Sequence, residues 1–567
     1  MYLTTLPEIQ PFYRTSPDIT KENWREKAAA KGAARVGLIP PEWRLPAEVS
    51  GDDTMLSVMD VPRTCGIFSE RELEITEEDD VGELARSIAE KRYSAVEVTV
   101  AYSKRAAVAH QLTNCLTEIF FDRALKRAAE LDEHVHRTGK VVGPLHGVPV
   151  SLKDQFDIEG LELTMGYAAY LGRVSERDCA LVKLLLDAGA VLYVRTNVPQ
   201  TMMISDTFNW IFGRTINPHN RKLVAGGSSG GEGALLAMKG SVLGVGTDIG
   251  GSIRIPSSFC GVYGLRPTSR RVPYGFATNS MLGQEAVPSV AGPLARSLSS
   301  CSYFMKTLLD LNPSKYDSGA LPFPFNSTAH DSAKTKKKLV FGLMKHDYNV
   351  LPVKPVRRAL RIAVEKLEAA GHEVVEFDNY AYKDARGLLD AFFRADGGED
   401  LRRAREAIDE PLIPLLTFDD PTQQKTVWET WQMGREKERL QQEFLAQWLK
   451  TAEVSSTGEP IDALICPVTT TPAYVPGTSL WAGYTGMFNL LDLPAMTVQV
   501  TKVDPFLDGP DPAFVPMTPK DEAVHAAYSA EVTAGCPVAI QLVGRRWQEE
   551  ELLGVGERLV KILGKPE

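Results

Sequence analysis

The sequence predicts an α/β fold: a central mixed, mostly parallel, twisted sheet, covered by helices on both faces and preceded by a helical N-terminal arm. An apolar strand at residues 148–152, a helix at 180–188 and a strand at 190–194 form a βαβ unit, which requires parallel strands. A helical stripe at 356–367 followed by a strand at 373–377 repeats this pattern. The first 140 residues show a mostly helical pattern.

Helix starts in the N-terminal region are indicated by capping-box spacings. Thr76 with Asp79, and Ser94 with Glu97, each place a hydroxyl three residues before an acidic side chain at the start of an apolar periodic run. We expect residues 1–75 to form the arm and residues 76–567 a single domain, with its catalytic core at about 140–310.

Two later segments differ in composition from the α/β pattern. Residues 312–338 are rich in Pro, Ser, Asp and Lys, which predicts a surface connection between two lobes. Residues 383–455 combine many charges with scattered aromatic residues and predict a helical insertion. This insertion is either a solvated cap or part of a substrate channel. Its aromatic residues include Trp428, Trp431, Phe444 and Trp448.

Composition excludes several classes of protein. The 567 residues are 44% hydrophobic and 24% charged with a net charge of -10, so neither nucleic acid nor an anionic membrane is an expected partner. No run of about 18 apolar residues predicts stable membrane insertion. Seven cysteines without paired spacing, and the absence of zinc-ligand spacing, predict no disulfide framework, no metal site and no cofactor. With no basic, apolar leader at the start, a cytoplasmic location is the simplest interpretation.

A segment rich in glycine and serine, residues 226–267, contains most of the candidate chemistry. Two glycine-rich turns flank a predicted helix at 234–238 and a strand at 241–245. Bare backbone N–H groups in such turns can bind an anion, either a phosphate or a tetrahedral oxyanion. Packing turns, a phosphate site and a serine nucleophile are therefore three interpretations. The spacing of a phosphate-binding Walker loop is absent, which disfavours the second.

One serine in this cluster fits a competing pattern. Residues 226–230 match Gly-x-Ser-x-Gly, which would make Ser228 the nucleophile of an esterase, with His525 as a base. The pattern is weak within a glycine-rich run, and His525 lies in a stretch with a helical, surface-like pattern. The alternative from another class is a non-catalytic nucleotide-binding protein.

Four segments resemble motifs of the amidase signature family. Residues 226–267 are similar to its signature, 143–154 to its lysine motif, 197–202 to the loop before the signature and 535–544 to its C-terminal strand. The resemblance runs from about residue 70 to the end. Within the family the chain is most similar to fungal acetamidases, and more distantly to fatty-acid amide hydrolase.

The resemblance implies a role for each matching residue. Ser252 would accept the acyl group, Ser228, after a cis peptide bond from Gly227, would relay protons, and Lys153 would be the base. The resemblance also implies that the substrate is bound by Met202, Ser228, Ile249, Gly250, Gly251 and Ser252. Of these, residues 249–252 would stabilise the oxyanion through their backbone N–H groups.

Elementary chemistry agrees with these roles. A lysine accepts a proton only when it is neutral, and Lys153 follows an apolar strand that can bury it and lower its pKa. A serine hydroxyl such as Ser228 can donate and accept at once. We expect Asp248 and Arg254 to hold the turn by pairing with each other or with the backbone, and Asp154 to be a local structural carboxylate.

The expected reaction is hydrolysis of a carboxamide to a carboxylic acid and ammonia or an amine through an acyl-serine. The resemblance favours small aliphatic or aromatic amides; an esterase or a fatty-acid amide hydrolase-like enzyme is the alternative. Apolar residues before the signature either line a closed pocket or belong to the core: Met202, Met203, Phe208 and Trp210. The helical arm makes a homodimer plausible.

Overall fold

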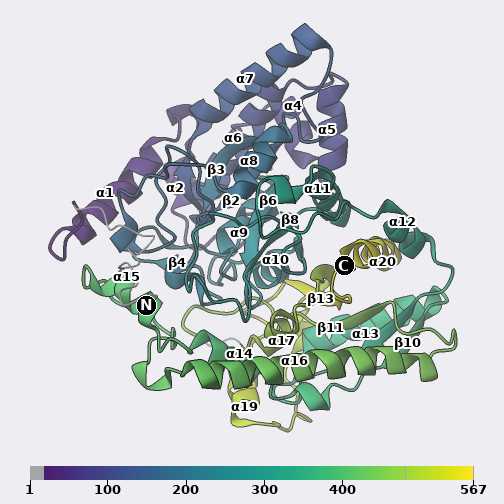
Figure 1. Ribbon diagram of the computed structural model, residues 1–567. Helices are drawn as coiled ribbons and strands as arrows, with labels where there is room; N and C mark the ends of the chain where they lie inside the picture. Colours follow the sequence, from purple (N-terminus) through teal and green to yellow (C-terminus); the bar gives the residue numbers. More distant parts are fainter. Residues whose placement is uncertain (1–17, 479–480, 566–567) are drawn as a thin grey trace, which may run out of the picture.

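The computed structural model describes residues 18–478 and 481–565, and an eleven-stranded sheet forms its centre (Figure 1). The strands lie in the order β1 (Leu116–Ile119), β3 (Val191–Thr196), β2 (Pro149–Lys153), β6 (Leu243–Asp248), β8 (Val290–Ala295), β7 (Tyr263–Arg266), β12 (Ala495–Lys502), β13 (Pro537–Val543), β11 (Ala463–Pro467), β9 (Val340–Leu343) and β10 (Glu373–Glu376).

The prediction of an α/β fold with a mixed central sheet is confirmed. Parallel pairing occurs in two blocks, β3–β2–β6 and β11–β9–β10. Among the described strands the other six pairings of this sheet are antiparallel, so the parallel share is smaller than expected. Strands buried on both faces carry the same continuous apolar pattern in either direction, which is why the sequence does not distinguish them.

Two groups of helices cover the sheet. α6 (Ala95–Thr113) contacts α7 (Phe121–Thr138) and α9 (Gly230–Ala237), and α9 contacts α10 (Arg254–Cys260). In the second group α11 (Leu298–Asp310), α12 (Ser327–Thr335) and α13 (Lys354–Ala369) all contact α20 (Glu549–Leu563). α8 (Ala180–Asp187) connects β2 to β3 and completes the predicted βαβ unit. Thus the segment predicted as a surface connection, 312–338, contains the packed helix α12.

The N-terminal region is helical, as predicted, although one capping box is wrong. Its described helices are α1 (Trp24–Gly37), α2 (Ala47–Ser50), α3 (Val61–Thr64), α4 (Glu70–Glu77) and α5 (Val81–Ala89). Thr76 lies inside α4, where its hydroxyl donates to the carbonyl of Glu72. Ser69 caps α4 and Asp80 caps α5, whereas the box of Ser94 and Glu97 is confirmed at the start of α6. α4 also crosses the predicted domain boundary at residue 75.

The predicted insertion consists of α14 (Ala385–Phe393), α15 (Glu399–Glu406) and α16 (Val427–Lys450), which lies along the lower edge in Figure 1. Phe444 and Trp448 are buried against α17 (Gly483–Leu491) and its surroundings, while Trp428 and Trp431 are about two-thirds exposed. The remaining described helices are α18 (Pro505–Asp508) and α19 (Pro519–Ala527), and a β4 (Phe208–Asn209) and β5 (Gly213–Arg214) hairpin stands apart from the sheet.

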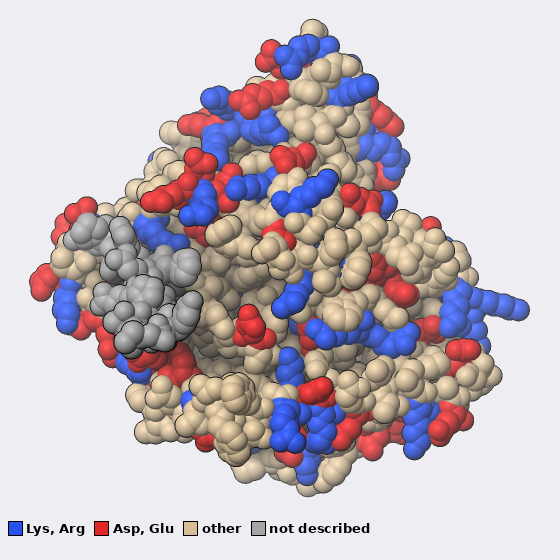
Figure 2. Space-filling model, in the orientation of Figure 1, with Lys and Arg blue, Asp and Glu red and all other residues tan. Residues whose placement is uncertain are grey.

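Figure 2 shows acidic and basic side chains interspersed over the visible face. Within the described ranges, no helix has the length and apolar character needed to cross a membrane.

Candidate active site

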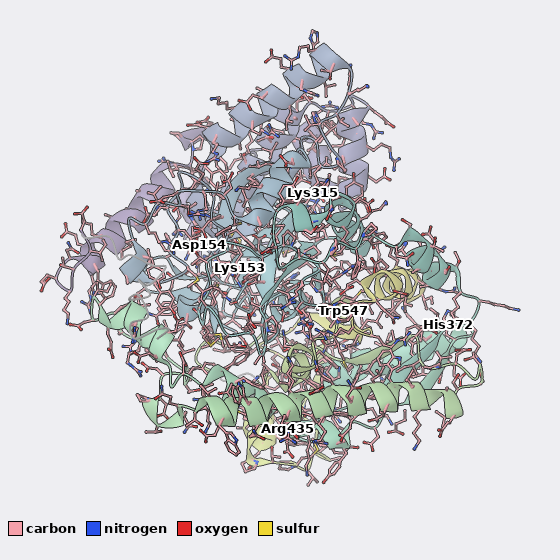
Figure 3. The ribbon with its side chains drawn as sticks, in the orientation of Figure 1. Lys153, Asp154, Lys315, His372, Arg435 and Trp547 are labelled. Carbon is pink, nitrogen blue, oxygen red and sulfur yellow. The ribbon has the colours of Figure 1, made fainter. Side chains whose placement is uncertain are left out.

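The parallel block β3–β2–β6 holds the predicted lysine on β2, the third strand from one edge of the sheet. Lys153 is the last residue of β2 and Thr247 lies near the end of β6, so the carboxyl ends of two parallel neighbours meet here. Figure 3 shows Lys153 and Asp154 in the interior of the molecule. The Lys153 side chain is fully buried, and its Nζ lies 2.7 Å from Ser228 Oγ and 2.7 Å from Thr247 Oγ1.

Ser228 occupies the turn that leads into α9. The peptide bond between Gly227 and Ser228 is cis, as the sequence resemblance implies. The backbone N–H of Ser229 donates to the carbonyl of Ser252 at 3.2 Å, which ties the first glycine-rich turn to the second. Within the described residues the Ser252 hydroxyl has no hydrogen-bond partner. Ser252 is one of the residues that line a cavity, whereas Ser228 is not. The structure therefore brings Lys153, Ser228 and Ser252 into one region, with Ser252 outermost.

An ion pair holds the second turn rigid. Asp248 and Arg254 are both completely buried and lie 3.0 Å apart, which confirms the expected pairing. Burial alone would raise the pKa of Asp248, but Arg254 and a hydrogen bond from Asn489 lower it far below its usual value. The turn also needs a glycine at position 251, where φ is +130° and a Cβ would lie 2.4 Å from Thr485 Oγ1.

Asp248 also accepts a hydrogen bond from one of the four backbone N–H groups that were expected to bind an oxyanion. The N–H of Gly251 donates to Asp248 Oδ1 at 2.8 Å, so this predicted donor is already engaged. The N–H groups of Ile249, Gly250 and Ser252 form no hydrogen bond within the described part of the chain, and these three residues line the cavity. They are the donors that remain for an oxyanion.

Burial also shifts the pKa values of Lys153 and of a neighbouring carboxyl group. It lowers the pKa of Lys153 from 10.5 to about 7, against the opposing effect of Asp248 and Glu232. Burial raises the pKa of Glu232 to about 8, which favours the neutral form of this carboxyl. The hydroxyls of Ser151 and Thr196 lie 2.6 and 2.9 Å from its oxygens. A neutral amine at Lys153 is therefore accessible near neutral pH.

The remaining charged and basic candidates have structural contacts. Asp154 accepts hydrogen bonds from the Thr164 hydroxyl and the Met165 N–H, as expected of a local carboxylate. His525, the alternative base, lies in α19 with its Nε2 2.8 Å from the carbonyl of Leu351 and its ring stacked on Phe514. Among the described residues, His525 forms no hydrogen bond, ion pair or ring contact with Ser228.

The cavity beside Ser252 has a volume of about 190 Å³. Met202 and Met203 line it, as one of the two interpretations expects, whereas Phe208 and Trp210 pack against each other outside it. Thr201 and Met202 have left-handed φ values of 69° and 60°, and the Ser280 hydroxyl fixes this loop by donating to the carbonyl of Thr201. A larger open depression of about 710 Å³ between α5, α11 and α12 contains none of these residues.

Several contributors to the site were not predicted. Thr247 contacts the Lys153 amine, Gln155 contacts Thr247, and Glu232 acts on the pKa of Lys153, although each lies in or beside a quoted motif. The insertion also supplies one wall of the cavity, which favours the substrate-channel interpretation over a solvated cap. These wall residues are Arg386, Phe393, Leu415, Thr417 and Phe418. They carry no local sequence signal, because only the folded chain brings them to Ser252.

Comparisons with known proteins agree with this geometry. A family model described as Amidase matches residues 97–553. The chain is 41% identical to an acetamidase of Emericella nidulans over 551 residues, covering 96% of this chain and 99% of that one. It is also 41% identical to an acetamidase of Aspergillus oryzae over 548 residues, again covering 96% and 99%.

Among solved structures, a fatty acid amide hydrolase superimposes with a TM-score of 0.90 at 30% identity, covering 97% of this chain and 98% of that chain. A structure described as an amidase gives a TM-score of 0.67 at 25% identity, covering 86% and 100%. The family match extends over most of the chain and includes Lys153 and both glycine-rich turns. The chain therefore belongs to the amidase signature family and is an amide-cleaving hydrolase.

Proposed function

We propose that the protein hydrolyses small carboxamides through an acyl-enzyme on Ser252, with Ser228 and Lys153 as the relay and the base. The observation that carries this proposal is the 2.7 Å contact between the buried Lys153 amine and Ser228, in a site where Ser252 lines the cavity. A serine needs a base within such reach to act as a nucleophile.

In the proposed reaction, the Ser252 oxygen attacks the amide carbonyl while its proton passes to Ser228, and the Ser228 proton passes to Lys153. The N–H groups of Ile249, Gly250 and Ser252 stabilise the oxyanion. As the C–N bond breaks, Lys153 returns a proton through Ser228 to the leaving nitrogen, which departs as ammonia or an amine. Water then attacks the acyl ester by the same relay and releases the carboxylic acid.

The substrate class follows from the size of the site. The cavity of about 190 Å³ is smaller than the roughly 300–1,000 Å³ of pockets that enclose drug-sized ligands. Two fungal relatives carry the name acetamidase, which agrees with a small acyl group. We therefore favour small aliphatic or aromatic amides.

We also propose a cytoplasmic location and a homodimeric assembly. All seven cysteines are free, which is typical of a reducing compartment and supports a cytoplasmic enzyme. A homodimer through the N-terminal arm stays a prediction, as does the division at residue 75. Neither nucleic acid nor any cofactor has a place in the proposed reaction.

A covalent serine probe tests the identity of the nucleophile. A fluorophosphonate should label Ser252 stoichiometrically, because its hydroxyl has no competing partner and Ser252 lines the cavity. Peptide mapping by mass spectrometry locates the label, with the Ser252→Ala protein as the control. Label on Ser228 would support the esterase alternative, and no label on either serine would contradict a serine mechanism.

The length of the acyl chain should matter strongly. We expect kcat/KM for a series of linear amides to peak at short acyl chains, because the walls leave little room beyond Ser252. Met203→Ala should move the peak to longer chains, since Met203 lines the cavity. Leu412→Ala is the matched control, because Leu412 belongs to the same apolar cluster but does not line the cavity. A kcat/KM that rises steadily up to fatty amides would contradict the proposal.

A further inference from the structure

A chain of hydrogen bonds leads from Lys153 in the direction away from Ser228. Lys153 Nζ lies 2.7 Å from Thr247 Oγ1, which lies 2.5 Å from Gln155 Oε1. On its other side, Gln155 Nε2 donates to the Tyr274 hydroxyl at 2.7 Å and to the carbonyl of Thr278 at 3.1 Å. Thr247 and Gln155 are buried and do not line the cavity, so neither has direct access to a substrate.

The backbone carbonyl of Thr278 determines which group donates and which accepts in the hydrogen bonds from Gln155 to Lys153. A backbone carbonyl can only accept, so the Gln155 amide must turn its NH₂ group toward Thr278 and its oxygen toward Thr247. The two segments are also paired by the Thr278 N–H, which donates to the backbone carbonyl of Gln155 at 2.9 Å. Since the Gln155 oxygen can only accept, the single hydroxyl proton of Thr247 must point to it.

The Thr247 oxygen is therefore left as an acceptor for an N–H of Lys153. This matters because a neutral amine has one lone pair, and two hydroxyls, those of Ser228 and Thr247, lie 2.7 Å from it. If Thr247 donated to the lone pair, Lys153 would present an N–H to Ser228 and could not accept its proton. With Thr247 committed to Gln155, only Ser228 can donate to the amine.

We propose that Gln155 and Thr247 are positioning residues that reserve the lone pair of Lys153 for the proton of Ser228. This inference rests on the proposed function of Lys153 as the base. Thr247 contacts the Lys153 amine directly and Gln155 acts on it through Thr247, and neither residue lines the cavity.

The Gln155 and Thr247 variants leave the charged and titratable residues around Lys153 in place. These residues come from α9, from β6 with α10, and from the strand ends β2 and β3: Glu232, Asp248, Arg254, Asp154 and Arg195. On the far side of Gln155, burial raises the pKa of Tyr274 to about 12, so its hydroxyl stays protonated and donates to Ser289 Oγ at 3.0 Å.

The test is a cycle of Gln155→Leu, Thr247→Val and the double variant. In Gln155→Leu the Thr247 hydroxyl is free to donate to the amine, so kcat should fall about 10- to 100-fold while KM stays nearly constant. That new hydrogen bond stabilises the neutral amine, so the acidic limb of kcat/KM should move to lower pH. Adding Thr247→Val removes the competing donor, and the double variant should recover activity relative to Gln155→Leu.

A purely structural role for Gln155 gives the opposite result. Loosened packing would admit water and move the acidic limb to higher pH, and the second substitution would lower kcat further. The inference is overturned if Gln155→Leu retains kcat within twofold, or if the double variant is less active than the single one. Gln499→Leu is the matched control, because Gln499 is a buried amide on β12 that bonds only to distant carbonyls.

Gln155→Met and Lys153→Ala complete the test. If Gln155→Leu does not fold, Gln155→Met removes the same acceptor with a more flexible side chain and carries the same expectations. Lys153→Ala distinguishes a failure of the proposed function from a failure of the positioning role alone. If the acidic limb persists in Lys153→Ala, the proposed function fails; if that limb is lost but the Gln155 cycle shows no competition, only the positioning role fails.

Discussion

Ser252→Ala should abolish amide hydrolysis almost completely and leave the protein folded. Loss of the covalent nucleophile in a serine hydrolase lowers kcat by several orders of magnitude, on the order of 10⁴–10⁶-fold. Within the described residues, the Ser252 hydroxyl makes no hydrogen bond, so its removal should change the free energy of unfolding by less than about 1 kcal/mol. The measurements are ammonia release from a short amide and thermal unfolding followed by circular dichroism.

Ser258→Ala is the matched control for this prediction. Ser258 is also buried and lies six positions further on, in α10, but does not line the cavity. Its substitution should leave kcat and KM close to those of the wild type. If Ser252→Ala retained activity within tenfold of the wild type, with an unchanged melting curve, Ser252 would not be the nucleophile.

The parts of the site that the sequence predicted are local in the chain. Lys153 ends an apolar strand and therefore had to be buried, and Ser252 closes a glycine-rich turn whose density indicates an anion-binding backbone. The pairing of Asp248 with Arg254 spans only six positions. In each case the residue and its neighbours in sequence form a pattern that can be recognised before the fold is known.

The parts that were missed depend on distant segments. The bond between Thr247 and Gln155 joins positions 92 residues apart, and that between Gln155 and the Thr278 carbonyl spans 123. Nothing local marks Gln155 as the partner of Thr247, because the pairing of β2 with β6 brings the two segments together. The cavity wall formed by Leu415 and Phe418 likewise depends on how the insertion folds back over Ser252.

The errors in secondary structure have similar causes. Thr76 fits the capping spacing formally, but Asp80, four positions later, offers a carboxylate that accepts from two N–H groups at the start of α5. The antiparallel strands β8, β12 and β13 are as apolar as the parallel ones, since helices cover the sheet. Their direction follows from connections that the apolar pattern does not encode.

The site also explains how a lysine can act as a base near neutral pH. Glu232 and Asp248 both favour the ammonium form of Lys153, yet burial outweighs them. The charge of Asp248 is offset by Arg254, and burial favours the neutral form of Glu232. Both effects weaken the attraction of these two carboxyl groups for the ammonium form, and desolvation stays the largest cause of the lowered pKa of Lys153.

Lys153→Ala should lower kcat/KM severely and remove its acidic limb. The base must be unprotonated, and burial places the pKa of Lys153 at about 7, so activity in the wild type should rise with pH through that region and level off above it. Loss of a general base costs about 10²–10⁴-fold. Lys153→Arg should not restore the rate, because a guanidinium stays protonated over this range.

The pH profile of kcat/KM for three variants decides between the two candidate bases. His525→Ala is the control, since His525 bonds to the carbonyl of Leu351 and stacks on Phe514, and its removal should leave both the plateau and the limb in place. Lys153→Ala and Lys153→Arg should both lose the limb, because no other group is within 2.7 Å of Ser228 to take its proton in the described chain. If the limb instead survived in Lys153→Ala and vanished in His525→Ala, a histidine would be the base, and the relay from Ser252 through Ser228 to Lys153 would be wrong.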